Sequence, residues 1–292
     1  RKSQKTWLLG SALLLAQSFS FPAYSMHGGS EDSVFVTDHN KQEMRSIGPA
    51  IMGGRVVDVA VVESKTSVIY AAIGPSGVWT SVNAGITCEP SFHLENSGAV
   101  GAVDVSQSHP DIVWVGTGEG TSRNSVGIGD GVYKSEDGGQ TCKNMGLENT
   151  RHISQILIDR NDTDIVYIGA LGHLWGPNEE RGLFKTTDGG QTWAKVLYVD
   201  ESTGIADLAM DPSNNRILYA ATWDYLRKPF HFRSGGPGSA IYKTTNGGET
   251  WRKIHLGLPS GDYGRIGLDV CRSRPEVVYA LVENANSGIF RS

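Results

Sequence analysis

Cysteine and positive charge are both scarce in this chain, and each shortage excludes a class of protein. Three cysteines among 292 residues, Cys88, Cys142 and Cys271, are too few for a fold held together by disulfides. Lys and Arg number 26 against 31 Asp and Glu, a net charge of -5, which argues against nucleic acid or an anionic membrane surface as a partner. After residue 25, no apolar run approaches the roughly 20 residues of a membrane helix, so we expect no membrane span.

The two ends of the chain carry information of their own. Arg1, Lys2 and Lys5 precede an apolar run over 7–16 and a small-residue exit near 23–25, a pattern that predicts a signal peptide over 1–25. We therefore expect a secreted or periplasmic protein, with a linker over 26–43. The chain starts without methionine and stops at Ser292 in the middle of a repeat, so we expect a fragment of a longer protein.

An eight-residue box recurs at intervals of 54, 51 and 58 residues. Its clearest copies read Thr-Thr-Asp-Gly-Gly-Gln-Thr-Trp at 186–193 and Thr-Thr-Asn-Gly-Gly-Glu-Thr-Trp at 244–251. The copies at 135–142 and 81–88 end in Cys142 and Cys88, which we interpret as small apolar replacements for tryptophan. We expect Cys271, on a strand pattern, to be a core residue.

A second repeated spacing, which we call the eleven-residue register, predicts the fold class. An aliphatic residue stands eleven positions before an aromatic one in five consecutive units, as in Val59 with Tyr70 and Ile156 with Tyr167. Short β-branched runs surround each pair, a third strand leads into each box and a fourth leaves it. Four antiparallel strands per roughly 50 residues are typical of a propeller blade. We predict an all-β propeller over 44–292, with blades at about 44–95, 96–150, 151–200, 201–260 and an incomplete 261–292.

The box residues form a hairpin turn between the third and fourth strands of a blade. The Asp or Asn can accept backbone N–H groups, and the glycine can take a positive φ. We therefore assign a structural role to fourteen residues: Ser81, Asn83, Gly85, Ser135, Asp137, Gly139, Thr186, Asp188, Gly190, Trp193, Thr244, Asn246, Gly248 and Trp251.

Strand parity separates the two faces of the propeller. The box turns share one face with the turns between first and second strands, and the loops between second and third strands lie on the opposite face. From the start of a box to the aliphatic residue of the next eleven-residue pair, the chain takes 21 to 24 residues. From the aromatic residue of a pair to the start of the next box, it takes 11 to 25 residues. Variable loops on a rigid scaffold usually carry binding residues, so we expect function on the face away from the boxes.

The boxes make the chain resemble the Asp-box (BNR) propeller superfamily, which includes sialidases, xyloglucanases and the sortilin ectodomain. The segments 44–49, 53–55, 172–177 and 234–245 are most similar to secreted bacterial sortilin-like proteins that are often labelled glycosyl hydrolases. The resemblance implies the fold and says little of activity. Xyloglucanases of the superfamily have an aspartate just after the second strand of blade one, where this chain reads Ala-Ile-Gly-Pro-Ser-Gly at 72–77. The arginine motif of sialidases is also missing before the first box.

Candidate ligand-binding residues lie in the predicted loops of the face away from the boxes. The loop at 116–125 is glycine-rich and carries Glu119 and Arg123, which either form an internal pair or serve a ligand. The loop of blade four, 222–233, combines aromatic rings with charges, as recognition grooves do, although its rings could instead cover the underside of the loop. The predicted ligand-binding residues are Arg55, Arg123, His173, Trp175, Trp223, Tyr225, Arg227, His231 and Arg233.

Three functions follow from this pattern. The first is a module that binds a peptide, protein or carbohydrate on the loop face. The second is a glycoside hydrolase that uses Asp224 or Glu119 with a second carboxylate beyond Ser292. The third is an assembly or stability factor with a protein partner. We expect no cofactor and no metal, since the acidic turn at 159–164 lacks the glycine and distal glutamate of a calcium loop.

Overall fold

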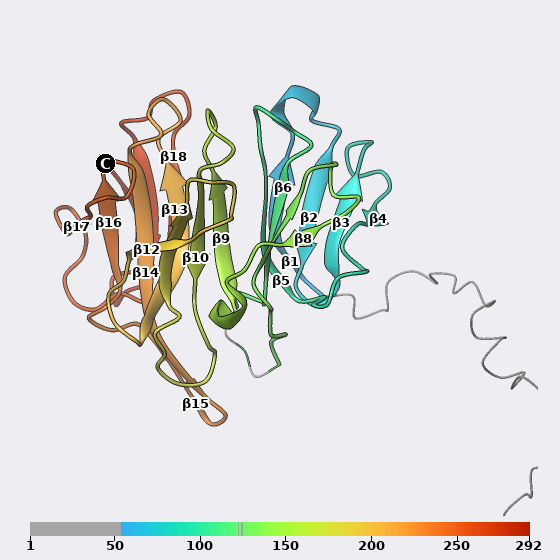
Figure 1. Ribbon diagram of the computed structural model, residues 1–292. Helices are drawn as coiled ribbons and strands as arrows, with labels where there is room; N and C mark the ends of the chain where they lie inside the picture. Colours follow the sequence, from blue (N-terminus) through green and yellow to red (C-terminus); the bar gives the residue numbers. More distant parts are fainter. Residues whose placement is uncertain (1–53, 122, 124) are drawn as a thin grey trace, which may run out of the picture. The chain divides into compact units, whose positions relative to one another are not determined.

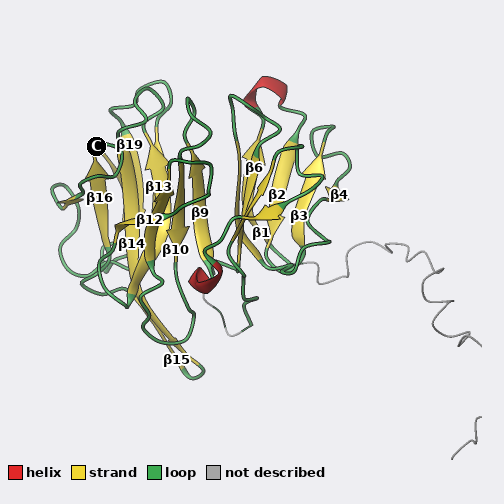
Figure 2. Cartoon of the chain, viewed as in Figure 1, coloured by secondary structure: helices red, strands yellow, loops and turns green. Residues whose placement is uncertain are grey.

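The computed structural model describes residues 54–121, 123 and 125–292, whose strands form five antiparallel sheets in chain order (Figures 1 and 2). The predicted signal peptide, the linker and the motif at 44–49 lie outside the described residues. Blade one holds β1 (Val56–Val61), β2 (Ile69–Ile73), β3 (Gly77–Ser81) and β4 (Glu89–Pro90). Blade two holds β5 (Val100–Val105), β6 (Val113–Thr117), β7 (Val132–Ser135) and β8 (Lys143–Asn144).

The later sheets follow the same order with two variations. Blade three holds β9 (Ile153–Ile158), β10 (Val166–Ala170), β11 (Gly182–Thr186) and β12 (Ala194–Leu197). Blade four holds β13 (Thr203–Met210), β14 (Leu218–Lys228), β16 (Ala240–Thr244) and β17 (Arg252–Ile254), and β15 (His231–Ser234) pairs with the end of β14. Blade five holds the three strands β18 (Ile266–Val270), β19 (Val278–Val282) and β20 (Gly288–Arg291). The predicted all-β propeller with an incomplete fifth blade is confirmed.

The first strands of successive blades lie side by side, and aspartates bridge three of the junctions. Asp58 accepts the backbone N–H of Val103 at 3.0 Å through its second carboxylate oxygen. Asp104 does the same for Ile158 at 2.9 Å, and Asp207 for Leu268 at 2.7 Å. A backbone donor that would otherwise be left unpaired in the sheet interior is thereby satisfied by the preceding blade.

The aromatic member of the eleven-residue register packs under the box of the next blade. Tyr70 donates its hydroxyl to the carbonyl of Gly138 at 3.1 Å, and Tyr167 donates to Gly247 at 2.9 Å. Trp114 lies beneath Gly190, where an added Cβ would come within 2.5 Å of the ring. The sequence register therefore marks a contact between blades, which explains why it recurs with constant spacing.

Burial of the third strands also depends on the neighbouring blade. Leu183 is fully buried beneath blade four, whereas its repeat equivalent Ile289 in blade five is 73% exposed. No described sheet covers blade five on that side. The apolar core is therefore a series of layers between blades.

Each box closes its own turn through the same bonds. In blade three, Thr186 Oγ1 accepts the N–H of Gly190 at 2.9 Å and donates to Asp188 at 2.7 Å. Asp188 accepts the N–H and the hydroxyl of Thr192 at 2.9 and 2.6 Å. These bonds lower the pKa of Asp188 to about 2, first of all the one from the Thr192 hydroxyl. The other three boxes repeat the bonds from the first residue and from the Asp or Asn.

The box turns lie on the same face as the turns between first and second strands. A backbone N–H of each box donates to the carbonyl of a residue in that turn: Ala84 to Ser67, Gly138 to Asp111, Gly189 to Asp164 and Gly247 to Arg216. The β14–β15 hairpin projects at the opposite end of the sheets (Figure 1). We name these two surfaces the box face and the loop face.

Two local expectations are wrong. The predicted loop over 222–233 is a β-hairpin, because β14 continues to Lys228 and pairs with β15 beyond the edge of blade four. Cys271 follows the last residue of β18 and is half-buried in a turn, so it is not part of the core. The three cysteines are free thiols, and Cys142 packs on the core layer between blades one and two.

Candidate functional site

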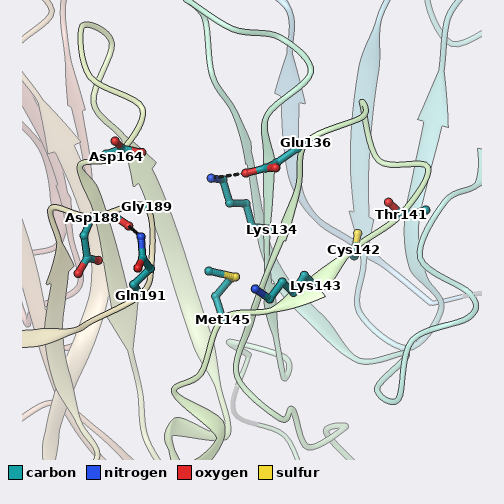
Figure 3. Close-up of a pocket in the computed structure, with 10 residues that line it drawn as sticks. All are labelled: Lys134, Glu136, Thr141, Cys142, Lys143, Met145, Asp164, Asp188, Gly189 and Gln191. Atoms are coloured by element: carbon teal, nitrogen blue, oxygen red, sulfur yellow. Dashed lines mark hydrogen bonds and ion pairs between the residues drawn. The ribbon is translucent and has the colours of Figure 1, made fainter.

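A large cavity of about 750 Å³ lies on the box face between blades two and three (Figure 3). Three of its ionic groups are engaged with their neighbours: Lys134 and Glu136 pair at 2.8 Å, and Asp188 is held by its own turn. Burial raises the pKa of the Cys142 thiol to about 12, which keeps it protonated and unreactive. The cavity is therefore an unpromising place for catalysis despite its size.

On the loop face, Glu119 pairs with a residue of another blade. Arg55, just before β1, donates to the Glu119 carboxylate at 2.9 Å and to the hydroxyl of Thr121 at 2.9 Å. The Glu119 side chain is 1% exposed. The predicted internal pair of Glu119 with Arg123 is thus wrong: Arg123 is exposed, and Glu119 has Arg55 as its cationic partner.

Glu119 also explains why blade one can lack a carboxylate after its second strand. Gly74 is the first residue after β2, and a Cβ added there would lie 2.4 Å from Oε1 of Glu119. The carboxyl of Glu119, delivered from blade two, therefore fills the space that a side chain at position 74 would need.

The loop of blade three, residues 171–181, is organised by a buried cation. Arg181 is fully buried and stacks on the ring of Tyr225 with a cation-to-centroid distance of 4.1 Å. Its guanidinium donates to four backbone carbonyls, of Ser202, Tyr225, His173 and Gly176. Burial lowers the pKa of Arg181, yet arginine remains charged. One side chain thus ties this loop to the hairpin of blade four.

Two of the predicted ligand-binding rings are buried. Trp223 and Tyr225 stack on each other at 4.6 Å and pack with Leu171, Leu174 and Ala206 in a small core beneath the hairpin. Because they are 3% and 1% exposed, neither offers a ring face to a ligand. Their expected role as stacking residues is therefore corrected to that of supports.

The remaining predicted residues of the hairpin spread along it. Asp224 is buried and pairs with Arg233 at 2.7 Å, so neither group is free. Arg227 lies over Phe232 and forms a backbone bridge to Trp175 of the neighbouring loop. His231 is exposed near the tip, where Phe230 is 86% exposed. Trp175 is 47% exposed and lies at the edge of a second cavity, on the loop face.

That cavity, which we name the loop-face pocket, has a volume of about 400 Å³ and lies between blades two and three. Its apolar lining comes from Val126, Ile128, Leu174 and Trp175, and its basic lining from Arg151, His152 and His173. His173 bonds the carbonyl of Asn149 at 3.1 Å. Of these seven residues, only His173 and Trp175 were predicted from the sequence.

Two of the five lining residues that sequence reasoning missed, Arg151 and His152, come from the connection between β8 and β9. This segment contains the short helix η2 (Glu148–Thr150), flanked by Leu147 and Arg151, which both have positive φ. Arg151 and His152 therefore turn back over the loop face. The nearly constant length of this connection indicated a plain link between blades, so no binding residue was predicted there.

Two searches of the described residues concern membranes and metals. Within 54–121, 123 and 125–292, no helix has the length and apolar character to cross a bilayer. Nor do three His, Cys, Asp or Glu side chains of this part of the chain converge as metal ligands would.

Comparisons with known proteins agree with the propeller. The chain is 26% identical to a xyloglucanase of Paenibacillus sp over 238 residues, 72% of this chain and 22% of that protein. It is 28% identical to xyloglucanase Xgh74A of Acetivibrio thermocellus over 168 residues, 48% of this chain and 18% of that protein. The chain thus spans about a fifth of the length of these curated relatives.

Solved structures share the fold at low identity. The GH74 xyloglucanase from Xanthomonas campestris superposes with a TM-score of 0.63 at 18% identity, covering 81% of this chain and 36% of that one. The GH74 enzyme of Niastella koreensis gives 0.60 at 21% identity, covering 81% and 36%. The model of the Sortilin-Vps10 family, described as sortilin, neurotensin receptor 3, matches residues 130–285, more than half of the chain. This sortilin-like propeller therefore belongs to the Sortilin-Vps10 family.

Proposed function

We propose that this propeller is a binding module of a secreted or periplasmic protein and that its loop-face pocket holds an apolar side chain of a peptide. The observation that carries the proposal is the lining of this pocket, which is mainly apolar, with Trp175 at the rim. Among the described residues that line it, none has a carboxylate or amide side chain, the groups that bind the hydroxyls of a sugar through paired hydrogen bonds. A peptide side chain suits this lining better than a glycan does.

The state of the two candidate carboxylates supports binding over hydrolysis. Glu119 lies beneath Arg55, and Asp224 is paired with Arg233. Each carboxylate already accepts a hydrogen bond from a guanidinium of this chain, so neither is free to bind a substrate or a water. Secretion or periplasmic location rests on the predicted signal peptide over 1–25.

A peptide array and a glycan array, probed with the same preparation, test the proposal. We expect peptides to bind, and Trp175→Ala to weaken that binding about tenfold or more, as for an aromatic side chain that contributes much of the binding energy. Ile86→Ala is the matched control, because Ile86 is an exposed apolar residue of a box turn. Binding to glycans alone, or equal binding by the Trp175→Ala protein, rejects the proposal.

A glycoside hydrolase is the second candidate, favoured by the xyloglucanase relatives and by the position of Glu119 against Gly74. In this alternative, Glu119 replaces the missing carboxylate of blade one. Xyloglucan hydrolysis that falls by several orders of magnitude in Glu119→Gln would establish it. Activity equal in the two proteins would clear Glu119 of a catalytic role. An assembly factor, the third possibility, would bind a protein partner with no turnover.

A further inference from the structure

Arg151 differs from the other half-buried arginines of the chain in that its charge has no partner. Its guanidinium has no hydrogen bond, ion pair or ring contact within the described residues. The other half-buried arginines of this part of the chain each have at least one such contact: Arg55, Arg160, Arg227, Arg233 and Arg265. Arg151 also lines the loop-face pocket, so its charge is available to a ligand there.

The walls of the loop-face pocket give this charge little compensation. Val126, Leu174 and Trp175 line the pocket with apolar surface, and none of its described lining residues has a carboxylate. A cation that has lost part of its water is stabilised by an anion that accepts its hydrogen bonds. The group that the pocket lacks is therefore an anion, and a ligand can supply it.

The backbone of Arg151 is strained. Its φ is 60° and its ψ is -37°. The N–H of His152 donates to the carbonyl of Thr150 at 2.6 Å, so Arg151 is the central residue of a γ-turn with positive φ, a rare conformation of high energy. Such strain persists only where the surrounding structure holds it in place, and it is frequent at ligand-binding positions.

Glycines of the loop between β6 and β7 hold Arg151 in this conformation. Gly129 donates its N–H to the Arg151 carbonyl at 2.8 Å. A Cβ at Gly118 would overlap the same carbonyl oxygen, so only glycine leaves room for it. The glycine-rich loop of blade two thus fixes the position of an arginine that follows blade two in the chain.

We propose, building on the peptide-binding function above, that Arg151 binds the carboxylate of an aspartate or glutamate in the peptide, next to the apolar side chain that enters the loop-face pocket. The planar fork of a guanidinium matches the two oxygens of a carboxylate, and nearby apolar groups strengthen the bond by excluding water. The net charge of the chain, -5, opposes an acidic peptide only at long range. Salt screens that repulsion beyond about 8 Å, whereas a contact with Arg151 is screened much less.

Three capped tripeptides test the selection, whatever the sequence of the natural peptide. The first is acetyl-leucyl-glutamyl-leucinamide, the second has glutamine in place of glutamate, and the third is the glutamine compound with a free terminal carboxylate. All are titrated against the protein and followed by ligand-observed NMR. A hydrogen bond to a charged group predicts that the glutamate compound binds about tenfold or more tightly than the glutamine amide.

The outcomes separate this inference from the proposed function. Equal binding of the glutamate and glutamine amides overturns the inference. A preference shown only by the free-carboxylate compound assigns the carboxylate to a chain end, which overturns the selection of an acidic side chain. Array peptides that bind through Trp175 and ignore an exchange of glutamate for glutamine leave the proposed function intact and overturn the inference alone.

Two variants assign the preference to Arg151. Arg151→Gln removes the charge, and we expect the two amides to bind equally, with the affinity of the glutamine amide kept. Arg151→Gly should give the same result, and glycine adopts the positive φ without strain, so this variant keeps the turn. Arg123→Gln is the matched control, because Arg123 is an exposed arginine in the loop between β6 and β7. A glutamate preference that persists in either Arg151 variant overturns the inference.

A measurement on the unmodified protein needs no variant. The side-chain Nε–H signal of an arginine shifts in NMR spectra when its guanidinium binds a carboxylate. We expect the Arg151 signal to shift on addition of the glutamate compound and to stay in place with the glutamine amide. An unshifted Arg151 signal at saturation with the glutamate compound overturns the inference.

Discussion

The box face and the loop face of this propeller are built from different kinds of contact. On the box face, four turns repeat the same bonds between residues two to four positions apart, as from Gly190 to Thr186. On the loop face, several contacts occur once and join distant segments: Arg55 and Glu119 are 64 positions apart, and Arg265 reaches the carbonyl of Gly120 from 145 positions away. Repeated bonds therefore mark the turns of the scaffold. Unrepeated long-range contacts occur on both faces, since Glu63 on the box face pairs with Arg160 and Arg272, but only on the loop face do they involve predicted site residues.

The largest loss of stability should follow from replacement of Arg181, which holds two loop-face segments together. Hydrogen bonds to charged groups contribute about 1.5–3 kcal/mol, and a desolvated cation–π contact about 2 kcal/mol. We therefore expect Arg181→Ala to lower the free energy of unfolding by about 3–4 kcal/mol, measured by urea denaturation. Arg181→Lys keeps the charge and loses the fork of donors, so most of the loss should remain. A loss below about 1 kcal/mol would mean that the two loops hold together without this cation.

Acid should weaken the loop face before the box face. The folded pKa of His152, about 4, lies below the ordinary value of 6.5, so its contribution is present above pH 6.5 and is lost as the pH falls through 4. At about 1.4 kcal/mol per pKa unit, the loss is on the order of 3 kcal/mol. The pKa of Asp188, about 2, means that its contribution is lost only from 3.8 downward. Burial raises the pKa of Asp104 to about 7, which adds stability as the pH falls and opposes this loss in both proteins. Urea denaturation from about pH 7 to about pH 4 should therefore show a less favourable change in the unmodified protein than in His152→Leu.

A difference in the free energy of unfolding between the two proteins that stays constant over that range would contradict the role of His152. The same result in both proteins would instead assign the acid sensitivity to a different group.

Substitution of two equivalent glycines distinguishes the free-energy penalty of the turn conformation from that of packing between blades. Gly85 and Gly190 both have positive φ, but an added Cβ meets nothing within 4 Å at Gly85 and meets Trp114 at 2.5 Å at Gly190. Gly85→Ala should therefore cost about 1 kcal/mol, for the left-handed backbone alone. Gly190→Ala should cost about 2–3 kcal/mol, since overpacking is added. Thermal or urea unfolding checks the difference, and equal losses would show that blade three can shift away from Trp114.

The smallest effect is expected at the tip of the hairpin. Phe230 is 86% exposed, so Phe230→Ala should change the free energy of unfolding by less than about 0.5 kcal/mol. The effect of Phe230→Ala on peptide affinity shows how far the binding site extends along the hairpin. Unchanged affinity confines recognition to the pocket and Trp175, whereas a clear loss would extend the site along the hairpin.

Much of the fold could be predicted because its signals are local. The eleven-residue register places an aliphatic residue of a first strand across from the second strand, and the box residues complete one turn. The hairpin was missed for an opposite reason. Trp223 and Tyr225 alternate with Asp224 and Leu226, a strand pattern, but the cluster of rings and charges favoured a loop.

The candidate site was less predictable because its residues are ordinary outside their tertiary context. Glu119 and Arg123 are close in the sequence, yet Glu119 binds Arg55 of another blade. Nothing around His152 distinguishes it from the seven other histidines before the fold buries it.

The amino-acid sequence by itself determined the blade repeat, the turn chemistry and the division into two faces, since each depends on bonds or alternations within a few residues. Tertiary structure alone decided which charges are paired, which rings are buried and where a pocket opens. Those properties depend on neighbouring blades that displace water from side chains far apart in the chain, and desolvation cannot be read from one segment at a time.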